Sequence, residues 1–76
     1  MAWVLYTRRG CHLCELAEDM LATWLPDVDV VDVDADAEAV PLYGCRVPVL
    51  LRDGTVVMEG RFHEPSLASL LAKPAC

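Results

Sequence analysis

The sequence predicts an α/β fold with elements in the order β–α–β–α–β–β–α, formed as a single domain over residues 1–76. Three observations predict it. The chain opens with a run of aromatic and β-branched residues, and a segment with helical spacing of apolar residues follows a glycine. Two later apolar runs flank the pair Asp53-Gly54, which is a strong hairpin signal.

The first two elements are the most strongly patterned. Residues 2–7 form a continuous apolar run, which is typical of a buried central strand. A helix is expected from about residue 11 to residue 25, where Pro26 ends it. Its apolar residues are spaced 3, 1, 3, 1 and 3 apart, which places them on one face: Leu13, Leu16, Ala17, Met20, Leu21 and Trp24. We expect Trp24, like Trp3 in the first strand, to lie in the core.

The middle of the chain is acidic and less regular. Residues 28–33 are expected to form a second strand, parallel to the first because the connection crosses over through a helix. Asp29 and Asp32 interrupt this strand, which favours a position near the sheet edge, and the acidic stretch 27–38 reads as a solvated edge. A short or irregular helix follows within residues 34–44, because Pro41 would break a long one and Gly44 is a natural C-cap.

The last part of the chain predicts a hairpin and a helix. Residues 47–51 and 55–59 are the two expected strands, and Gly60 turns the chain after them. The last helix opens at residues 64–66, where proline occupies the first turn. Its apolar face is Leu67, Leu70 and Leu71, and Lys73-Pro74 is expected to end it.

Composition excludes several classes of function. The net charge is −6 and the pI is about 4.5, so we expect no nucleic-acid partner. No apolar run approaches the roughly 18–20 residues of a membrane helix. The apolar N-terminal stretch is too short for a secretory signal and runs into Arg8-Arg9. We therefore expect a soluble cytoplasmic protein, acting as a monomer and without a membrane partner.

Two of the four cysteines, Cys11 and Cys14, form a C-x-x-C motif between the first strand and the first helix. A thiolate attacks disulfides, and a helix N-terminus favours the anion. Arg8 and Arg9 lie just upstream, and such settings lower a cysteine pKa to roughly 3.5–7.5. We predict that Cys11 is the exposed nucleophile. Cys14, one turn later, is predicted to be less exposed and less acidic, and to release the bound partner.

Other interpretations of the cysteines stay open. A C-x-x-C motif can be half of a zinc site or an inert buried pair, but zinc usually needs four ligands and no second C-x-x-C exists. The spacing of the other candidate ligands suggests no site, so we predict no metal: Cys45, Cys76, His12 and His63. We expect Cys45 to be a buried or half-buried structural cysteine, or else an extra thiol near the site. Cys76 is expected to be incidental, and His63 to be a loop residue before the last helix.

Residues 5–15, which contain the C-x-x-C motif, resemble the active-site region of glutaredoxins. Residues 47–50, Val-Pro-Val-Leu, resemble the Thr-Val-Pro segment of that family, with Arg46 in place of the threonine. The segment 31–34, Val-Asp-Val-Asp, and the Asp53-Gly54 hairpin match the glutaredoxin family in order and spacing. The resemblance covers nearly the whole chain and is closest to compact bacterial glutaredoxin-like proteins.

This resemblance implies a thioredoxin-like fold, with a four-stranded mixed sheet flanked by helices. It also implies that Pro48 is cis and faces the cysteine pair, so that the backbone of Val47 turns outward to pair with an extended substrate. Arg8 would contact the carboxylate of glutathione. The implied activity is thiol–disulfide exchange on glutathione mixed disulfides or protein disulfides, without a bound cofactor and with glutathione as a possible co-substrate.

Two departures from the family pattern bear on function. His12-Leu13 replaces the usual Pro-Tyr pair, and His12 is either a thiolate-stabilising imidazolium or an exposed polar residue. The Gly-Gly pair before the last helix is reduced to Gly60, followed by Arg61, which either binds a substrate carboxylate or is solvated. Two other functions stay open by resemblance: an iron–sulfur module using Cys11 of two chains, and a non-catalytic adaptor.

Overall fold

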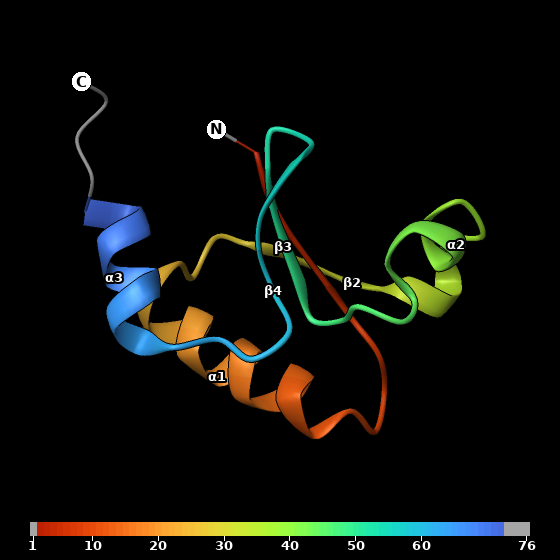
Figure 1. The fold of residues 1–76 in the computed structure, drawn as a ribbon, viewed down its shortest axis with the longest axis horizontal. Coiled ribbons are helices and arrows are strands. Elements are labelled where there is room, and N and C mark those ends of the chain that lie inside the picture. Colours follow the sequence, from red (N-terminus) through yellow and green to blue (C-terminus); the bar gives the residue numbers. More distant parts are fainter. Residues whose placement is uncertain (1, 73–76) are drawn as a thin grey trace.

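The elements occur in the predicted order in the computed structural model, which describes residues 2–72 and their side chains as far as Leu70 (Figure 1). The strands are β1 (Trp3–Thr7), β2 (Asp29–Asp32), β3 (Val49–Arg52) and β4 (Thr55–Glu59). The helices are α1 (His12–Trp24), α2 (Ala39–Tyr43) and α3 (Glu64–Ala72), and a short 3₁₀ turn, η1 (Val33–Ala35), follows β2.

The four strands form one mixed sheet in the order β2-β1-β3-β4. Strand β1 pairs parallel with β2 and antiparallel with β3, and β3 pairs antiparallel with β4. The predicted central position of the first strand and edge position of the second are confirmed. Asp53 and Gly54 join β3 to β4 with φ angles of 51° and 85°, the pair of positive values that a two-residue hairpin turn of this hand requires.

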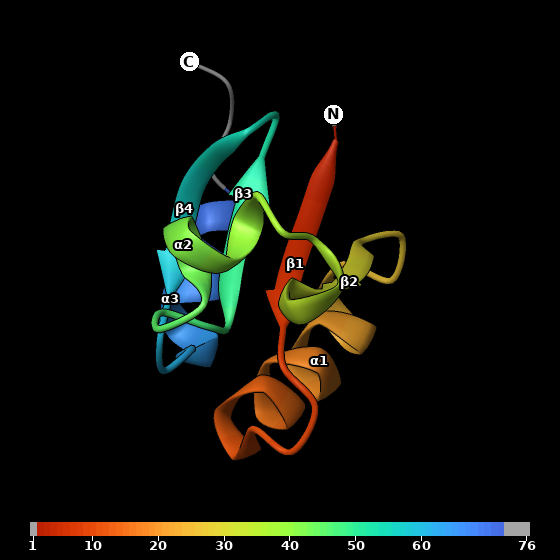
Figure 2. The ribbon, with the colours of Figure 1, turned by 90° about the vertical axis from the view of Figure 1, so that its right-hand side faces the viewer.

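Helices α1 and α3 cover one face of the sheet, and α2 lies on the other (Figures 1 and 2). Leu5 and Leu50 are opposite each other in the β1–β3 register, so their side chains point to the same face. They form the centre of the core cluster, whose members are Leu5, Ala17, Leu21, Leu50, Phe62 and Leu67. On the opposite face, the ring of Tyr6 stacks on Tyr43 of α2 with centroids 5.1 Å apart. The sheet is therefore covered on both sides.

The prediction that Trp24 lies in the core is wrong, because its side chain is 40% exposed. The buried residues of α1 are Cys14, Ala17 and Leu21, spaced i, i+3 and i+7. At about 100° per residue, this face is rotated away from the apolar stripe that the sequence suggested, which left out Cys14. Leu16 lies outside this buried face and is 46% exposed. Trp24, the last residue of α1, is not among the residues that pack against the core cluster, whereas Met20 and Leu25 are.

Most element boundaries differ from the expected ones by only one or two residues. The segment 34–44, expected to hold one short or irregular helix, holds the end of η1 and the five residues of α2. Gly44 caps α2 by donating its N–H to Val40 O at 2.8 Å. The predicted helix end at Lys73-Pro74 and the terminal Cys76 lie outside the described residues. Within residues 2–72, no helix is long and apolar enough to cross a membrane.

Candidate active site

One end of the sheet gathers the segments that the sequence singled out. Strands β1 and β2 end there, at Thr7 and Asp32, which are paired in register. Strand β3 begins at the same end, with Val49 paired with Tyr6 of β1 and with Glu59 at the end of β4. Figure 2 shows β1 running down to this end of the sheet and into the loop that leads to α1. The C-x-x-C motif, the Val-Pro segment and Gly60 therefore all lie next to this end of the sheet.

The Val47–Pro48 peptide bond is cis, as the family resemblance implied. The β1–β3 register, continued by one residue, places Pro48 opposite Thr7 at the strand end that leads to the cysteines. Pro48 is buried, and its carbonyl accepts a hydrogen bond from Gly60 N–H at 2.9 Å. Within the described chain, the N–H and C=O of the half-buried Val47 make no backbone hydrogen bond. Both groups can therefore form hydrogen bonds with a bound chain, the N–H as donor and the C=O as acceptor.

Cys11 is the N-cap residue of α1 and is partly exposed. Its backbone is extended, and its Sγ accepts a hydrogen bond from Cys14 N–H at 3.2 Å. In most helices a side-chain oxygen of the N-cap residue accepts this backbone N–H. Here the sulfur of Cys11 accepts it. The Cys11 sulfur therefore faces a backbone N–H and the positive end of the helix dipole.

Cys14 is fully buried in the first turn of α1. This burial, together with the interaction of its side chain with that of Cys11, raises the pKa of the Cys14 thiol to about 12. Cys14 therefore stays protonated at neutral pH, and it is the less exposed of the two cysteines, as predicted. A protonated thiol one turn away from Cys11 cannot react first, but it can act after Cys11 has reacted.

Stability is expected to fall at alkaline pH because of Cys14. In the folded protein the pKa of Cys14 lies above the ordinary value of about 9, so folding favours the neutral thiol. Its contribution to the unfolding free energy is complete below about pH 9 and is lost as the pH rises towards 12. Denaturant unfolding of the reduced protein, compared with the Cys14→Ala variant, isolates this effect from tyrosine titration. The difference in unfolding free energy between the two proteins should shrink between pH 8 and pH 11. A constant difference would show that Cys14 does not titrate in this way.

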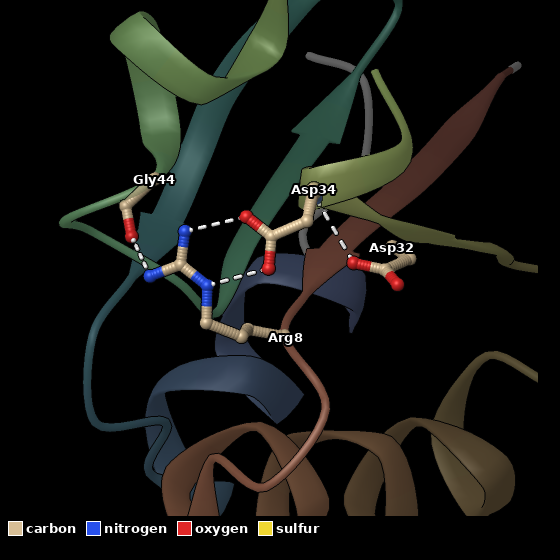
Figure 3. Close-up of polar contacts among 4 residues, drawn as sticks. All are labelled: Arg8, Asp32, Asp34 and Gly44. Carbon is tan, nitrogen blue, oxygen red and sulfur yellow. Dashed lines mark hydrogen bonds and ion pairs between the residues drawn. The ribbon is translucent and has the colours of Figure 1, made fainter. Parts of the chain in front are cut away.

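Arg8 connects the end of β1 to two other segments (Figure 3). Its Nε and Nη2 donate to the two carboxylate oxygens of Asp34, each at 2.9 Å, and its Nη1 donates to Gly44 O at 2.7 Å. The Arg8 hydrogen bond holds the pKa of Asp34 below its usual range. Asp34 is itself positioned by a turn in which its N–H donates to Asp32 Oδ1 at 2.9 Å. A side chain at Gly44 would meet Val40 O at 2.6 Å and Arg8 Nη2 at 3.3 Å, so only glycine fits this contact.

Arg46, like Arg8, binds both a carboxylate and a backbone carbonyl near the C-terminal end of α2. Its Nε donates to Glu59 Oε2 at 2.9 Å, its Nη2 pairs with the same oxygen, and its Nη1 donates to Leu42 O at 3.2 Å. Its guanidinium also lies over the ring of Tyr43, 5.8 Å from the centroid. Arg8 and Arg46 thus bind two carbonyls at the C-terminal end of α2, where cations are favourable. Together they fix the connection from α2 to Pro48.

The remaining predicted site residues occupy different places. Arg9 and His12 are exposed beside Cys11, and His12 Nδ1 lies 4.0 Å from Glu15. Arg61 is exposed and lines a groove of about 360 Å³ between α1 and the start of α3. The roles assigned to these three residues stay predictions. Cys45, expected to be at least half buried, is exposed, because it lies in the turn between α2 and β3 and outside the core.

Sequence reasoning missed Asp34 and Glu59 as parts of this end of the sheet. Each lies far in sequence from its arginine, by 26 and 13 residues, so no local spacing marks the pair. Asp34 was also hidden within an acidic stretch that read as a solvated edge. Among residues 2–72, no three His, Cys, Asp or Glu side chains gather in a way that could hold a metal ion.

A four-stranded mixed sheet covered by helices on both faces, with a C-x-x-C pair where the first helix begins, defines a thioredoxin-like α/β protein. Comparison with known proteins agrees with this class. The model of the family described as "Glutaredoxin-like domain (DUF836)" matches residues 3–72, and the chain belongs to this glutaredoxin-like family. None of the curated proteins matches the chain.

Two solved structures are similar to this chain over nearly its whole length. An X-ray structure of the structural genomics target protein XcR50 from X. campestris is 39% identical, with a TM-score of 0.79, and the match covers 96% of this chain and 100% of that one. A solution structure of XcR50 is 40% identical, with a TM-score of 0.73 and coverage of 97% of each chain. Family and fold together support a redox-type function of the thioredoxin class.

Proposed function

We propose that this protein is a thiol–disulfide oxidoreductase in which Cys11 is the nucleophile and Cys14 the resolving thiol. The observation that carries the proposal is the asymmetry of the pair. Cys11 Sγ is partly exposed at the start of α1 and accepts the Cys14 amide, whereas the Cys14 thiol is buried and protonated.

The proposed reaction has two exchange steps. The Cys11 thiolate attacks one sulfur of a substrate disulfide, forms a new S–S bond and releases the other sulfur as a thiolate. Cys14 then loses its proton, which passes through solvent to a released thiolate, and its sulfur attacks Cys11 Sγ. The second substrate thiolate leaves, the protein ends with a Cys11–Cys14 disulfide, and the substrate has gained two electrons.

Val47 supplies the proposed docking point for the substrate chain. Its N–H and C=O have no partner within the described backbone, and they lie next to Pro48 at the cysteine end of the sheet. An extended polypeptide segment that carries the disulfide can pair with both groups as an additional strand would. Glutathione mixed disulfides and protein disulfides both contain such backbone groups.

Competitive alkylation and a redox titration test the proposal. In the reduced protein at neutral pH, iodoacetamide should modify Cys11 first and Cys14 last, with Cys45 as an exposed reference thiol in the same sample. The Cys11–Cys14 couple should then titrate near the cytosolic poise of roughly −220 to −320 mV. Equal alkylation of Cys11 and Cys45, or a potential far below that range, would show a structural pair and overturn the assignment.

A further inference from the structure

The two arginines next to the Val-Pro segment are already bound to carboxylates of the same chain. All three guanidinium nitrogens of Arg8 are used, two on Asp34 and one on Gly44 O. All three nitrogens of Arg46 are also used, two on a single carboxylate oxygen of Glu59, Oε2, and one on Leu42 O in α2. A planar fork that binds a carboxylate through two nitrogens is the strongest recognition an arginine offers. At both positions this fork is occupied from within.

We propose that Asp34 and Glu59 act as built-in carboxylates that keep both arginines from anionic ligands, so that the site selects protein disulfides over glutathione disulfide. The inference rests on the proposed function, because it concerns the substrate class of the same cysteine pair. Asp34 and Glu59 are specificity-determining residues in this view. They set which partner can approach Cys11 without taking part in sulfur exchange.

The charge of glutathione disfavours its docking at this site. Each glutathione unit carries two carboxylates and one ammonium group at neutral pH, so the tripeptide is anionic and needs cations at its docking site. Asp34 and Glu59 are tethered next to their arginines, which gives them an effective concentration in about the millimolar range or higher. A carboxylate of glutathione can bind an arginine only if it displaces Asp34 or Glu59. Because glutathione meets the protein only transiently, it loses this competition.

The geometry of Asp34 strengthens the competition further. Its carboxylate is held in place before any ligand arrives, because its own N–H is bound to Asp32 Oδ1 in the η1 turn. Glu59 is held at the end of β4, in register with Val49. The net charge of −6 acts in the same direction, since it opposes the approach of an anionic disulfide.

A polypeptide disulfide meets none of these obstacles. Its backbone N–H and C=O groups pair with Val47, which requires no cation, and the residues beside its cysteine need carry no charge. The substrate class that fits this end of the sheet is therefore a disulfide within an extended protein segment.

The test compares two disulfides on the same sample of reduced protein. One is glutathione disulfide, and the other is a disulfide of a short peptide with its N-terminus acetylated and its C-terminus amidated, which has backbone groups but no free carboxylate. The measured quantity is the ratio of the two second-order rates with Cys11, read by mass spectrometry. Because it is a ratio, its value does not depend on the concentration of active protein. The wild-type ratio should favour the blocked peptide by about tenfold or more.

The Asp34→Asn and Glu59→Gln variants free the arginines, and combining them should raise the relative rate with glutathione disulfide by about tenfold. Matched controls are Glu38→Gln and Asp27→Asn, which each remove one exposed carboxylate that makes no ion pair in the described chain, and they should change the ratio by no more than about twofold. An unchanged ratio in the double variant, or an equal rise in the controls, would overturn the inference alone. If the wild-type protein reacts with neither disulfide, the proposed function fails and this inference with it.

Discussion

Replacement of Cys11 by serine is expected to lower the rate of disulfide exchange by at least about 1,000-fold, because the other described thiols are Cys14, which is buried and protonated, and Cys45, which lies in a turn away from the helix start. A hydroxyl at the same place is not ionised at neutral pH and does not attack sulfur. The measurement is reduction of a peptide disulfide under saturating reductant. Circular dichroism should show an unchanged fold, since Cys11 is partly exposed and contributes little to the core.

The Cys14→Ser variant should behave differently. Its first step is intact, so a mixed disulfide between Cys11 and the substrate accumulates instead of being released. Mass spectrometry after proteolysis locates the adduct, and Cys45→Ser serves as the matched control because it removes an exposed thiol in the turn after α2. An adduct found on Cys45, or rapid turnover by Cys14→Ser, would show that the nucleophile and the resolving thiol have been misassigned.

The fold could be predicted from the sequence because each element carries a local signal. The apolar run of β1, the turn at Asp53-Gly54 and the glycines at element ends all reflect short-range backbone preferences. The parallel pairing of β1 and β2 also followed, since a strand–helix–strand connection has a fixed hand. Apart from the β1–β2 pairing, which rests on this rule of handedness, these constraints are local, and a single sequence is informative about them.

The two failures concern side-chain burial, which depends on the partner surface. Trp24 reads as core from its helical spacing, yet the face of α1 that packs is centred on Cys14, Ala17 and Leu21. Cys45 reads as buried because free cysteines usually are, yet it lies in an exposed turn. The spacing of apolar residues shows that this segment is a helix. It gave the wrong direction for the buried face because Cys14, which belongs to that face, was left out of the apolar stripe.

The candidate site divides in the same way. Cys11 and Cys14 were visible because their spacing and their place before a helix are local. The contacts of Arg8 and Arg46 were not, because their carboxylates come from β2–η1 and β4 and meet the arginines only after the sheet has formed. The family resemblance implied that Arg8 contacts the carboxylate of glutathione. In the structure its guanidinium is bound to Asp34 (Figure 3).

These contacts also explain how a helix of only five residues persists. An isolated helix as short as α2 is not stable in water. Its C-terminal carbonyls are bound by two arginines, and Tyr43 is placed between the ring of Tyr6 and the guanidinium of Arg46. The same contacts fix the residues that lead to Pro48, so the stability of α2 and the shape of the docking segment depend on one set of interactions.

The largest expected loss of stability comes from Leu50→Ala. Leu50 is fully buried in β3, opposite Leu5, and packs in the cluster that joins the sheet to α1 and α3. Truncation leaves a cavity and is expected to cost about 2–5 kcal/mol. For a domain of this size, that corresponds to a fall in Tm of at least about 8 °C. Thermal and denaturant unfolding of the reduced protein measure both quantities.

The matched control is Leu42→Ala, because Leu42 is 57% exposed on α2 and loses few contacts on truncation. It should change the unfolding free energy by no more than about 0.5 kcal/mol. If Leu50→Ala does not fold, Leu50→Val removes a single methylene and should still cost about 1 kcal/mol, since the site is closely packed. Equal effects at Leu42 and Leu50 would mean that the core does not lie between the sheet and the pair α1 and α3. In that case the α1 N-terminus would lack the rigid support that holds Cys11 beside the Val-Pro segment.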